Sequence, residues 1–98
     1  MKQLVIRTIA EDDLDAAVKW YESLRPGLGT DFLSAVEVAL DDIVKHPEAS
    51  ASIYKNLRRA HIRRFPYGIF YCVDEHRIVV VGVIHGSQSP RVWKRRAP

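Results

Sequence analysis

Basic side chains and a histidine recur at two-residue steps in one stretch of the chain. Arg59, His61 and Arg63 alternate with Ala60 and Ile62. Alternate residues of a β-strand point to the same face of a sheet, so this spacing predicts a row of positive charge across one face. Such a row suits a polyanion or an acidic protein segment. The alternative is edge-strand charge that contacts only solvent.

A second group of candidate residues lies near the C-terminus. His85 follows a hydrophobic run, and an unperturbed histidine titrates near roughly pH 6.5, so its ring is a candidate general acid or base. Residues 91–96 are basic and include one tryptophan, and arginine and tryptophan dominate the energetic hot spots of protein interfaces. We expect the following residues to line the working surface: Arg59, His61, Arg63, His85, Arg91, Trp93 and Lys94.

The sequence lacks the patterns that cofactors and metals commonly require. It has no glycine-rich phosphate loop and no nucleophile elbow. Its four histidines are not spaced with cysteine or carboxylate partners in the way that metal ligands are. We therefore expect neither a cofactor nor a metal site.

Two features indicate a cytoplasmic protein. The single cysteine, Cys72, lies inside a hydrophobic run, where we expect it to fill the core, and a chain with one cysteine forms no internal disulfide. No apolar run approaches the roughly 20 residues of a membrane helix, and the N-terminus has no signal-peptide core. We expect no membrane partner.

The two halves of the chain carry opposite charge. Residues 1–50 contain five basic and ten acidic side chains, a net of −5, whereas residues 51–98 contain ten basic and two acidic ones, a net of +8. A cationic surface of this density favours a polyanionic or acidic partner. The alternative is that the two halves neutralise one another across the fold.

The elements that position these residues centre on a β-hairpin. Two hydrophobic runs, 65–73 and 78–84, flank the polar turn 74–77, and both are rich in aromatic and β-branched residues. Because both runs are apolar at nearly every position, we expect both faces of these strands to be covered.

The first half predicts a short strand at residues 4–6 and then two antiparallel helices. Thr8 and Glu11 have the spacing of a capping box, so the first helix should begin near Ile9. Trp20 lies off its apolar stripe and is expected to pack on the second helix, with a partner contact as the alternative. Residues 25–29 break the helix, and the second helix is expected to use Thr30 or Asp31 as its cap.

The remaining segments complete one domain, residues 1–98. We interpret residues 48–57 as a crossing loop, residues 58–65 as a strand, and the basic C-terminus as a tail or a short helix anchored by Val92 and Trp93. The predicted class is α+β: an N-terminal strand and an antiparallel two-helix hairpin packed on a small antiparallel sheet (β-α-α-β-β-β).

Along nearly its whole length the chain resembles the RelE/ParE family of bacterial type II toxins. The resemblance rests on the order and spacing of Ala-Glu-Asp-Asp-Leu at 10–14, Trp20-Tyr21-Glu22, Gly27-Leu28-Gly29, Phe32-Leu33, His46-Pro47, Arg64-Phe65-Pro66-Tyr67-x-Ile69-x-Tyr71-x-Val73 and Val83-Ile84-His85-Gly86. It implies a strand, a helical hairpin and a three-stranded antiparallel run. It also implies a cytoplasmic toxin that a cognate antitoxin neutralises by wrapping it with a flexible segment.

Members of this family stop growth by cleaving mRNA on the ribosome or by interfering with DNA gyrase. At positions where the nucleases typically carry two arginines and a tyrosine, this chain has Gly68, a residue among 86–88, and Trp93. The gyrase-directed branch shares the histidine-glycine pair and often has arginine where this chain has Gln88. The resemblance therefore implies a non-catalytic, ParE-like gyrase inhibitor of the kind associated with plasmid stabilisation.

Two alternatives remain beside this interpretation. One is a ribosome-dependent mRNA endonuclease in which Arg63, His85 and Arg91 replace the usual catalytic set. The other is an inactive relic that binds its antitoxin and has no target. In either case the antitoxin is expected to lay an acidic, amphipathic segment over the helical hairpin and the cationic sheet face.

Overall fold

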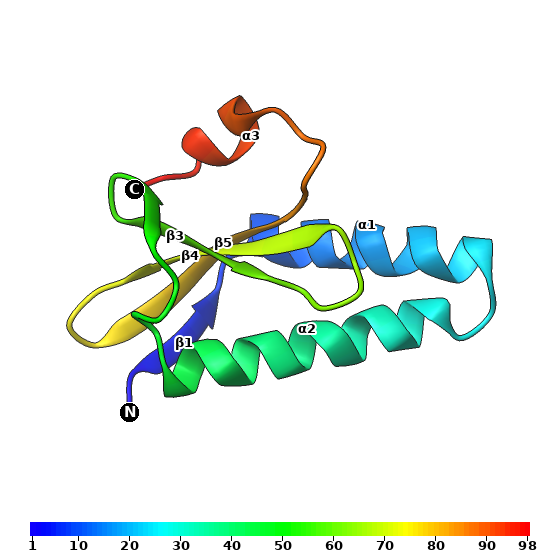
Figure 1. Cartoon of the computed structure of the whole chain (residues 1–98), viewed down its shortest axis with the longest axis horizontal. Coiled ribbons are helices and arrows are strands. Elements are labelled where there is room, and N and C mark those ends of the chain that lie inside the picture. Colours follow the sequence, from blue (N-terminus) through cyan, green and yellow to red (C-terminus); the bar gives the residue numbers. More distant parts are fainter.

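One strand, a helical hairpin, four further strands and a short terminal helix follow one another along the chain, and the five strands form one sheet (Figure 1). The structure is a computed structural model that describes all 98 residues. Its elements are β1 (Gln3–Ile6), α1 (Thr8–Leu24), α2 (Leu28–Lys45), β2 (Ser52–Tyr54), β3 (Leu57–His61), β4 (Tyr67–Val73), β5 (Arg77–His85) and α3 (Pro90–Lys94). The predicted α+β class, N-terminal strand and helical hairpin are confirmed.

The strands of the sheet lie in the order β1-β5-β4-β3-β2. β3, β4 and β5 form the expected antiparallel run, with Ala60 opposite Ile69 and Ile69 opposite Val83. β1 adds a parallel pairing at the far edge, where Leu4 lies opposite Ile78. β4 and β5 therefore lie between neighbours on both sides, which agrees with their nearly continuous apolar sequences.

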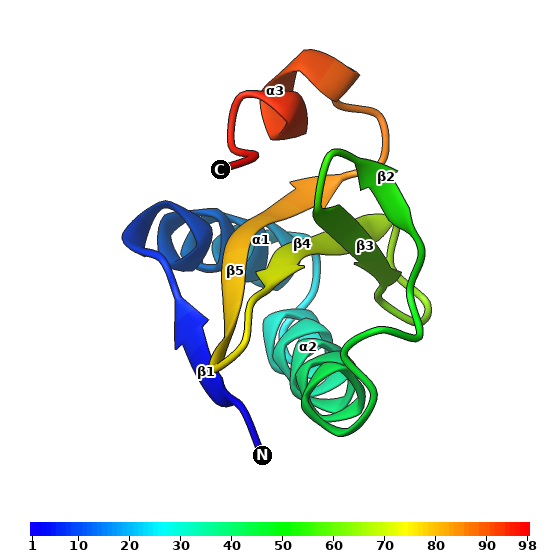
Figure 2. The ribbon, with the colours of Figure 1, turned by 90° about the vertical axis from the view of Figure 1, so that its left-hand side faces the viewer.

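Both faces of the sheet are covered, as the sequence predicts (Figure 2). α1 and α2 pack on one face, where Phe32 and Tyr71 are fully or almost fully buried. α3 and the C-terminal residues cover the other face, where Val92 and Trp93 pack against a cluster that includes Phe70. The basic C-terminus thus forms the second covering layer of a three-layer arrangement.

Two segments differ from the prediction around β3. Residues 52–54 form the strand β2 inside the expected crossing loop, because three residues are too few to show an alternating pattern in the sequence. β3 ends at His61, so Arg63 does not continue the predicted cationic row. Arg64 adopts a left-handed conformation with φ of 73° in the turn that follows, which reverses the chain before Pro66.

The helix starts also differ from the prediction. The N-cap of α1 is Arg7, whose backbone carbonyl accepts from the Ala10 and Glu11 N–H groups, and the cap has no side-chain hydrogen bond. The predicted capping box with Thr8 is therefore wrong, because Thr8 is already helical. α2 begins at Leu28, ahead of the predicted caps Thr30 and Asp31.

A residue of the preceding helix explains the early start of α2. The Glu22 carboxylate accepts hydrogen bonds from the N–H groups of Gly27 and Gly29, and the shortest N···O distance is 3.0 Å to each. Gly27 has φ of 89°, a conformation that glycine adopts without steric cost. Trp20, which we expected to pack on α2, is 59% exposed.

Candidate functional site

Four of the seven predicted surface residues line one cavity on the sheet face opposite the helical hairpin. Arg59, His61, His85 and Trp93 surround a space of about 220 Å³. Arg59 and His61 come from β3, His85 from the end of β5 and Trp93 from α3. The fold therefore brings together residues that are up to 34 positions apart in the sequence.

Gly68 on β4 makes room for one of these side chains. A Cβ atom at Gly68 would lie 3.0 Å from both Cγ and Cδ of Arg59, so the stem of Arg59 lies across this glycine. The Arg59 side chain takes part in none of the ion pairs of the structure. It therefore offers an uncompensated positive charge to a ligand or partner.

His85 is half-buried at the junction of β5 and the following loop. Its Nδ1 accepts a hydrogen bond from the Ser87 N–H at 2.9 Å, so the neutral ring carries its proton on Nε2. Its ring lies edge-on to Tyr67, with the ring centroids 5.1 Å apart. Burial, and secondarily the charge of Asp13, raises the pKa of Tyr67, so its hydroxyl stays protonated at neutral pH.

Trp93 forms the aromatic part of the cavity. Its ring stacks on Phe70 at a centroid distance of 5.5 Å and meets Tyr54 edge-on at 6.4 Å. The Lys94 ammonium lies 5.3 Å from the Tyr54 ring centroid and 5.9 Å from that of Trp93. A cation held over aromatic rings adds attraction without an ion-pair partner.

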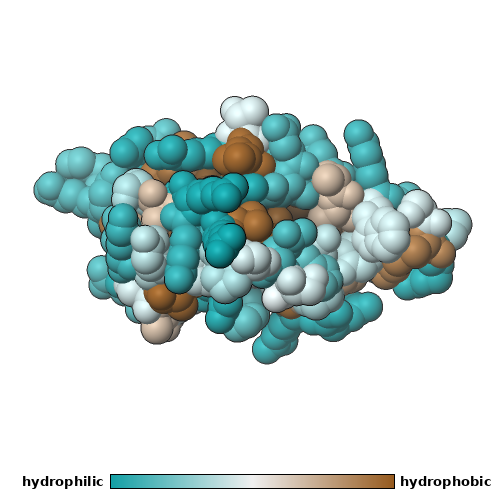
Figure 3. Space-filling model, turned by 90° about the horizontal axis from the view of Figure 1, so that it is seen from above, coloured by the Kyte–Doolittle hydropathy of each residue, from teal (hydrophilic) through white to brown (hydrophobic).

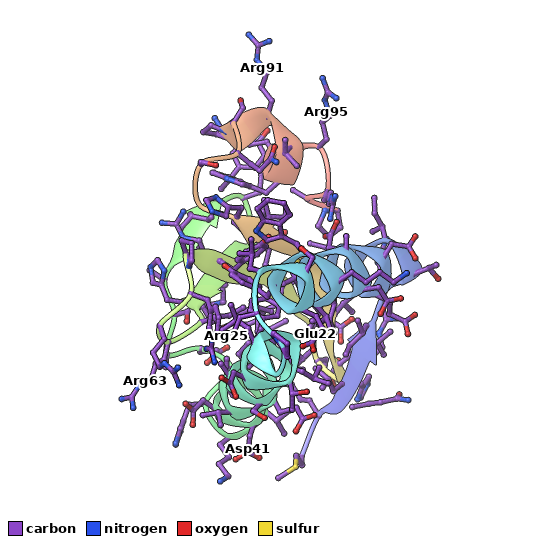
Figure 4. All side chains as sticks on the ribbon, turned by 90° about the vertical axis from the view of Figure 1, so that its right-hand side faces the viewer. Glu22, Arg25, Asp41, Arg63, Arg91 and Arg95 are labelled. Carbon is purple, nitrogen blue, oxygen red and sulfur yellow. The ribbon has the colours of Figure 1, made fainter.

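Of the three other predicted residues, Lys94 lies against Trp93, whereas Arg63 and Arg91 lie apart from this cavity. Arg91 extends from α3 away from the rest of the molecule, as does Arg95, while Arg63 projects from a different side (Figure 4). Arg63 lines a separate hollow beside α2. The three residues Arg63, His85 and Arg91 therefore do not converge on one point.

Sequence reasoning missed a second cavity on the other side of His85. Asp13, Tyr67, His85 and Arg96 line a space of about 260 Å³ between α1 and the C-terminal residues. In the sequence, Asp13 is one acidic residue of the first predicted helix and Arg96 is one residue of a basic tail. No local pattern could have paired them, because 83 residues separate them in the chain.

The surface around α3 is mostly hydrophilic, and its hydrophobic atoms form small separate patches (Figure 3). No group of three or more histidine, cysteine, aspartate or glutamate side chains is placed to hold a metal ion. None of the helices combines the length and the apolar character needed to cross a bilayer.

The arrangement is similar to that of two solved toxin–antitoxin structures. A chain of the chromosomal ParDE toxin–antitoxin system from P. aeruginosa matches with a TM-score of 0.66 at 20% identity, over 87% of this chain and 96% of that one. A chain of the RelBE2 toxin–antitoxin complex from Mycobacterium tuberculosis matches with a TM-score of 0.57 at 22% identity, over 86% and 96%. These likenesses show that the chain shares its fold with both structures.

The family follows from the sequence match. Residues 4–90 match the model of the ParE toxin of the type II toxin–antitoxin system, parDE, and the chain belongs to this family. No curated protein matches the sequence. The matched region ends at the first residue of α3, so Arg91, Trp93 and Lys94 lie beyond it.

Proposed function

We propose that this toxin stops growth by binding DNA gyrase and that a cognate antitoxin neutralises it in the cytoplasm. One observation carries the proposal: the cavity of Arg59, His61, His85 and Trp93 combines positive charge with stacked aromatic rings. The family match and the ParDE neighbour support the ParE-like branch.

The chemistry of this surface suits adhesion. Arginine and tryptophan are enriched at interface hot spots because they bury a large area and offer several donors or a polar edge. Arg59 has no counter-ion, and Lys94 is held over aromatic rings beside the cavity, so an acidic segment of a target protein would meet two cations and an aromatic platform. We propose that Arg91 extends this surface along α3.

Cleavage of mRNA makes different demands on the same surface. It requires cationic groups around one phosphate, together with groups that move protons to and from the reacting oxygens. Gly68 lines the cavity where the nucleases of the family typically carry one arginine, and Gly86 and Gln88, two of the three residues among which their second arginine would fall, line it as well. None of these residues supplies a positive charge. The separation of Arg63 and Arg91 from His85 also favours adhesion over the endonuclease alternative.

The test begins with expression of the chain alone and together with candidate antitoxin genes from its source genome. We expect growth arrest that one of these genes relieves, induction of a DNA-damage response, and inhibition of supercoiling by purified gyrase. The double variant Arg59→Glu with Trp93→Ala should lose inhibition. Lys19→Glu on α1, a charge reversal at an exposed position, should keep it.

Each other outcome counts against the proposal. Codon-positioned cuts in cellular mRNA with unaffected gyrase would favour the ribosome-dependent endonuclease. No growth arrest from the isolated chain would favour a relic that retains only antitoxin binding. If Lys19→Glu lost as much inhibition as the double variant of Arg59→Glu and Trp93→Ala, the cavity would not be the working surface.

A further inference from the structure

A groove runs between α2 and the β3 edge of the sheet. Two hollows of about 360 and 280 Å³ share Ala39, Asp42 and His61 and so form one continuous depression. Its α2 wall extends from Ala35 to His46, which corresponds to about 16 Å of helix at 1.5 Å per residue. This groove lies along α2, which contributes no residue to the cavity around Trp93.

Its α2 wall is built to receive apolar side chains. Ala35 and Ala39 face the groove one turn apart and leave room because their side chains are small. Val38 lies at the same wall and is 59% exposed, although most valines in folded proteins are buried. An apolar surface of this kind gains stability when a partner covers it.

The opposite wall supplies charge and a free strand edge. Arg63 and Arg64 line it together with His61, and neither arginine takes part in an ion pair. β2 pairs with β3 only as far as Arg58. The Ile62 N–H donates to the Tyr67 carbonyl on β4, so the backbone groups of His61, one residue earlier, point to the outer edge, which has no strand neighbour.

Charge distinguishes this groove from the outer surface of the hairpin. α1 carries five acidic and one basic side chain, and α2 carries four acidic and one basic. The outer faces of both helices therefore repel an acidic segment, so we place it beside the hairpin and not over it. At the β3 wall an apolar surface meets two arginines that form no ion pair.

We propose that the α2–β3 groove binds an acidic segment of the antitoxin, with apolar side chains against Ala35, Val38 and Ala39 and carboxylates toward Arg63 and Arg64. This inference rests on the proposed neutralisation by an antitoxin and adds the surface on which it occurs. His61 lines both this groove and the cavity of the proposed target surface. A segment in the groove therefore reaches the edge of that surface, which explains how its binding blocks the target.

A nucleic acid fits the groove less well. Asp42 lies on the α2 wall of both hollows. A phosphate backbone carries a charge at every nucleotide, so part of it would lie against Asp42 and the apolar α2 wall. A peptide can instead place its carboxylates at Arg63 and Arg64 alone and its apolar side chains at the α2 wall.

The experiment measures binding of the antitoxin that restores growth in the co-expression test, by surface plasmon resonance against the full chain. Val38→Asp should raise the dissociation rate at least about tenfold, because it places a charge against apolar side chains of the partner. The matched control is Leu24→Asp, since Leu24 is 57% exposed at the end of α1 and should give wild-type kinetics.

The charge of the β3 wall is tested separately. Arg63→Glu with Arg64→Glu should slow association at low salt, and the difference from wild type should shrink at high salt as the charges are screened. Arg91→Glu with Arg95→Glu makes the same change of charge on α3 and should leave the association rate within about twofold of wild type. Circular dichroism of each variant establishes that it folds.

Several results would overturn the inference and leave the proposed function standing. One is wild-type kinetics in both groove variants. Another is a dissociation rate in Leu24→Asp raised as much as in Val38→Asp. A third is a larger fall of the association rate in the α3 variant than in Arg63→Glu with Arg64→Glu. If a single-stranded oligonucleotide competed with the antitoxin for the wild-type chain but not for Val38→Asp, the groove would be a nucleic-acid site. Failure of the wild-type chain to bind any antitoxin would instead overturn the proposed function.

Discussion

Arg96 and Asp13 join the C-terminus of the chain to α1 at an edge of the sheet. The two guanidinium Nη atoms donate to the two carboxylate oxygens, with 3.3 Å between Nη2 and Oδ1. The side chains are only 17% and 20% exposed. Arg96 also donates to the Val81 carbonyl at 3.2 Å, and Asp13 accepts from the Val83 N–H at 3.0 Å.

This ion pair replaces a missing strand. β1 ends at Ile6, opposite Val80, so the next residues of β5 have no strand neighbour on that side. The two side chains form hydrogen bonds with the Val81 carbonyl and the Val83 N–H, which have no strand partner there. In doing so they hold the segment that carries Trp93 and Lys94 over the second face of the sheet.

Arg96→Ala should lower the free energy of unfolding by about 1.5–3 kcal/mol, because it removes charge-assisted hydrogen bonds and leaves the Asp13 carboxylate without its partner. Urea denaturation at pH 7 measures the change. In a double-mutant cycle, the double variant of Arg96→Ala and Asp13→Ala should lose much less unfolding free energy than the sum of the losses in the two single variants.

The neighbouring residue provides the control for this prediction. Arg95 is exposed and extends away from the molecule, so Arg95→Ala should change the unfolding free energy by less than about 0.5 kcal/mol (Figure 4). Equal effects of the two alanine variants would show that Arg96 contributes no more than a solvated charge.

Glu22→Ala should lower the unfolding free energy by about 0.5–2 kcal/mol, as expected for loss of a helix N-cap. The Gly27 and Gly29 N–H groups lose their acceptor, and urea denaturation again gives the change. Glu11→Ala on the same helix is the control, because Glu11 is exposed and its side chain makes no hydrogen bond or ion pair. An unchanged Glu22→Ala variant would contradict the capping role.

Gly29→Ala should destabilise the hairpin for a steric reason. A Cβ atom at this position would lie 2.8 Å from the backbone oxygen of Val18, which moves only if α1 and α2 separate. At Gly27 a Cβ atom would meet nothing within 4 Å, so Gly27→Ala should cost only the strain of φ at 89°, on the order of 1 kcal/mol. Thermal unfolding of both variants compares the two causes, and a milder effect of Gly29→Ala would contradict close helix packing.

Asp74→Ala should destabilise the protein more at pH 7 than at pH 3. Hydrogen bonds from the His76 and Arg77 N–H groups, and then the Arg77 side chain, lower the pKa of Asp74. A lowered folded-state pKa stabilises the fold above the unfolded value of roughly 3.9, and this contribution is lost as the pH falls through the folded-state value. Urea midpoints measured from pH 7 to pH 2.5 should therefore converge for variant and wild type.

Glu75→Ala is the matched control in this turn, because the Glu75 side chain is 88% exposed. Its urea midpoint should follow that of wild type across the same pH range. A constant difference between Asp74→Ala and wild type at every pH would show that the aspartate acts through its shape and not through its charge.

Cys72 should react with a thiol reagent at pH 8 more than about tenfold more slowly in the native protein than in urea. Burial raises the pKa of this thiol, although the charge of Arg7 opposes the shift, and the residue is only 5% exposed. Equal reaction rates in both states would mean that β4 opens readily.

The elements whose patterns are local could be predicted from the amino-acid sequence alone. The 3.6-residue stripes gave the two helices, and the continuous apolar runs around residues 74–77 gave a central hairpin with both faces covered. The break at Pro26 and the stop at Pro47 are equally local, because proline restricts its own backbone and that of its neighbour.

Tertiary structure decided everything that depends on residues far apart in the chain. Glu22 caps a helix that it does not belong to, and Arg96 finds Asp13 across 83 residues. The cationic row failed at Arg63 because a left-handed turn ends the strand, which the two-residue spacing of side chains does not reveal. The groove between α2 and β3 likewise exists only where a helix and a strand edge meet, so the sequence supplied its residues and the packing of the layers gave them a common surface.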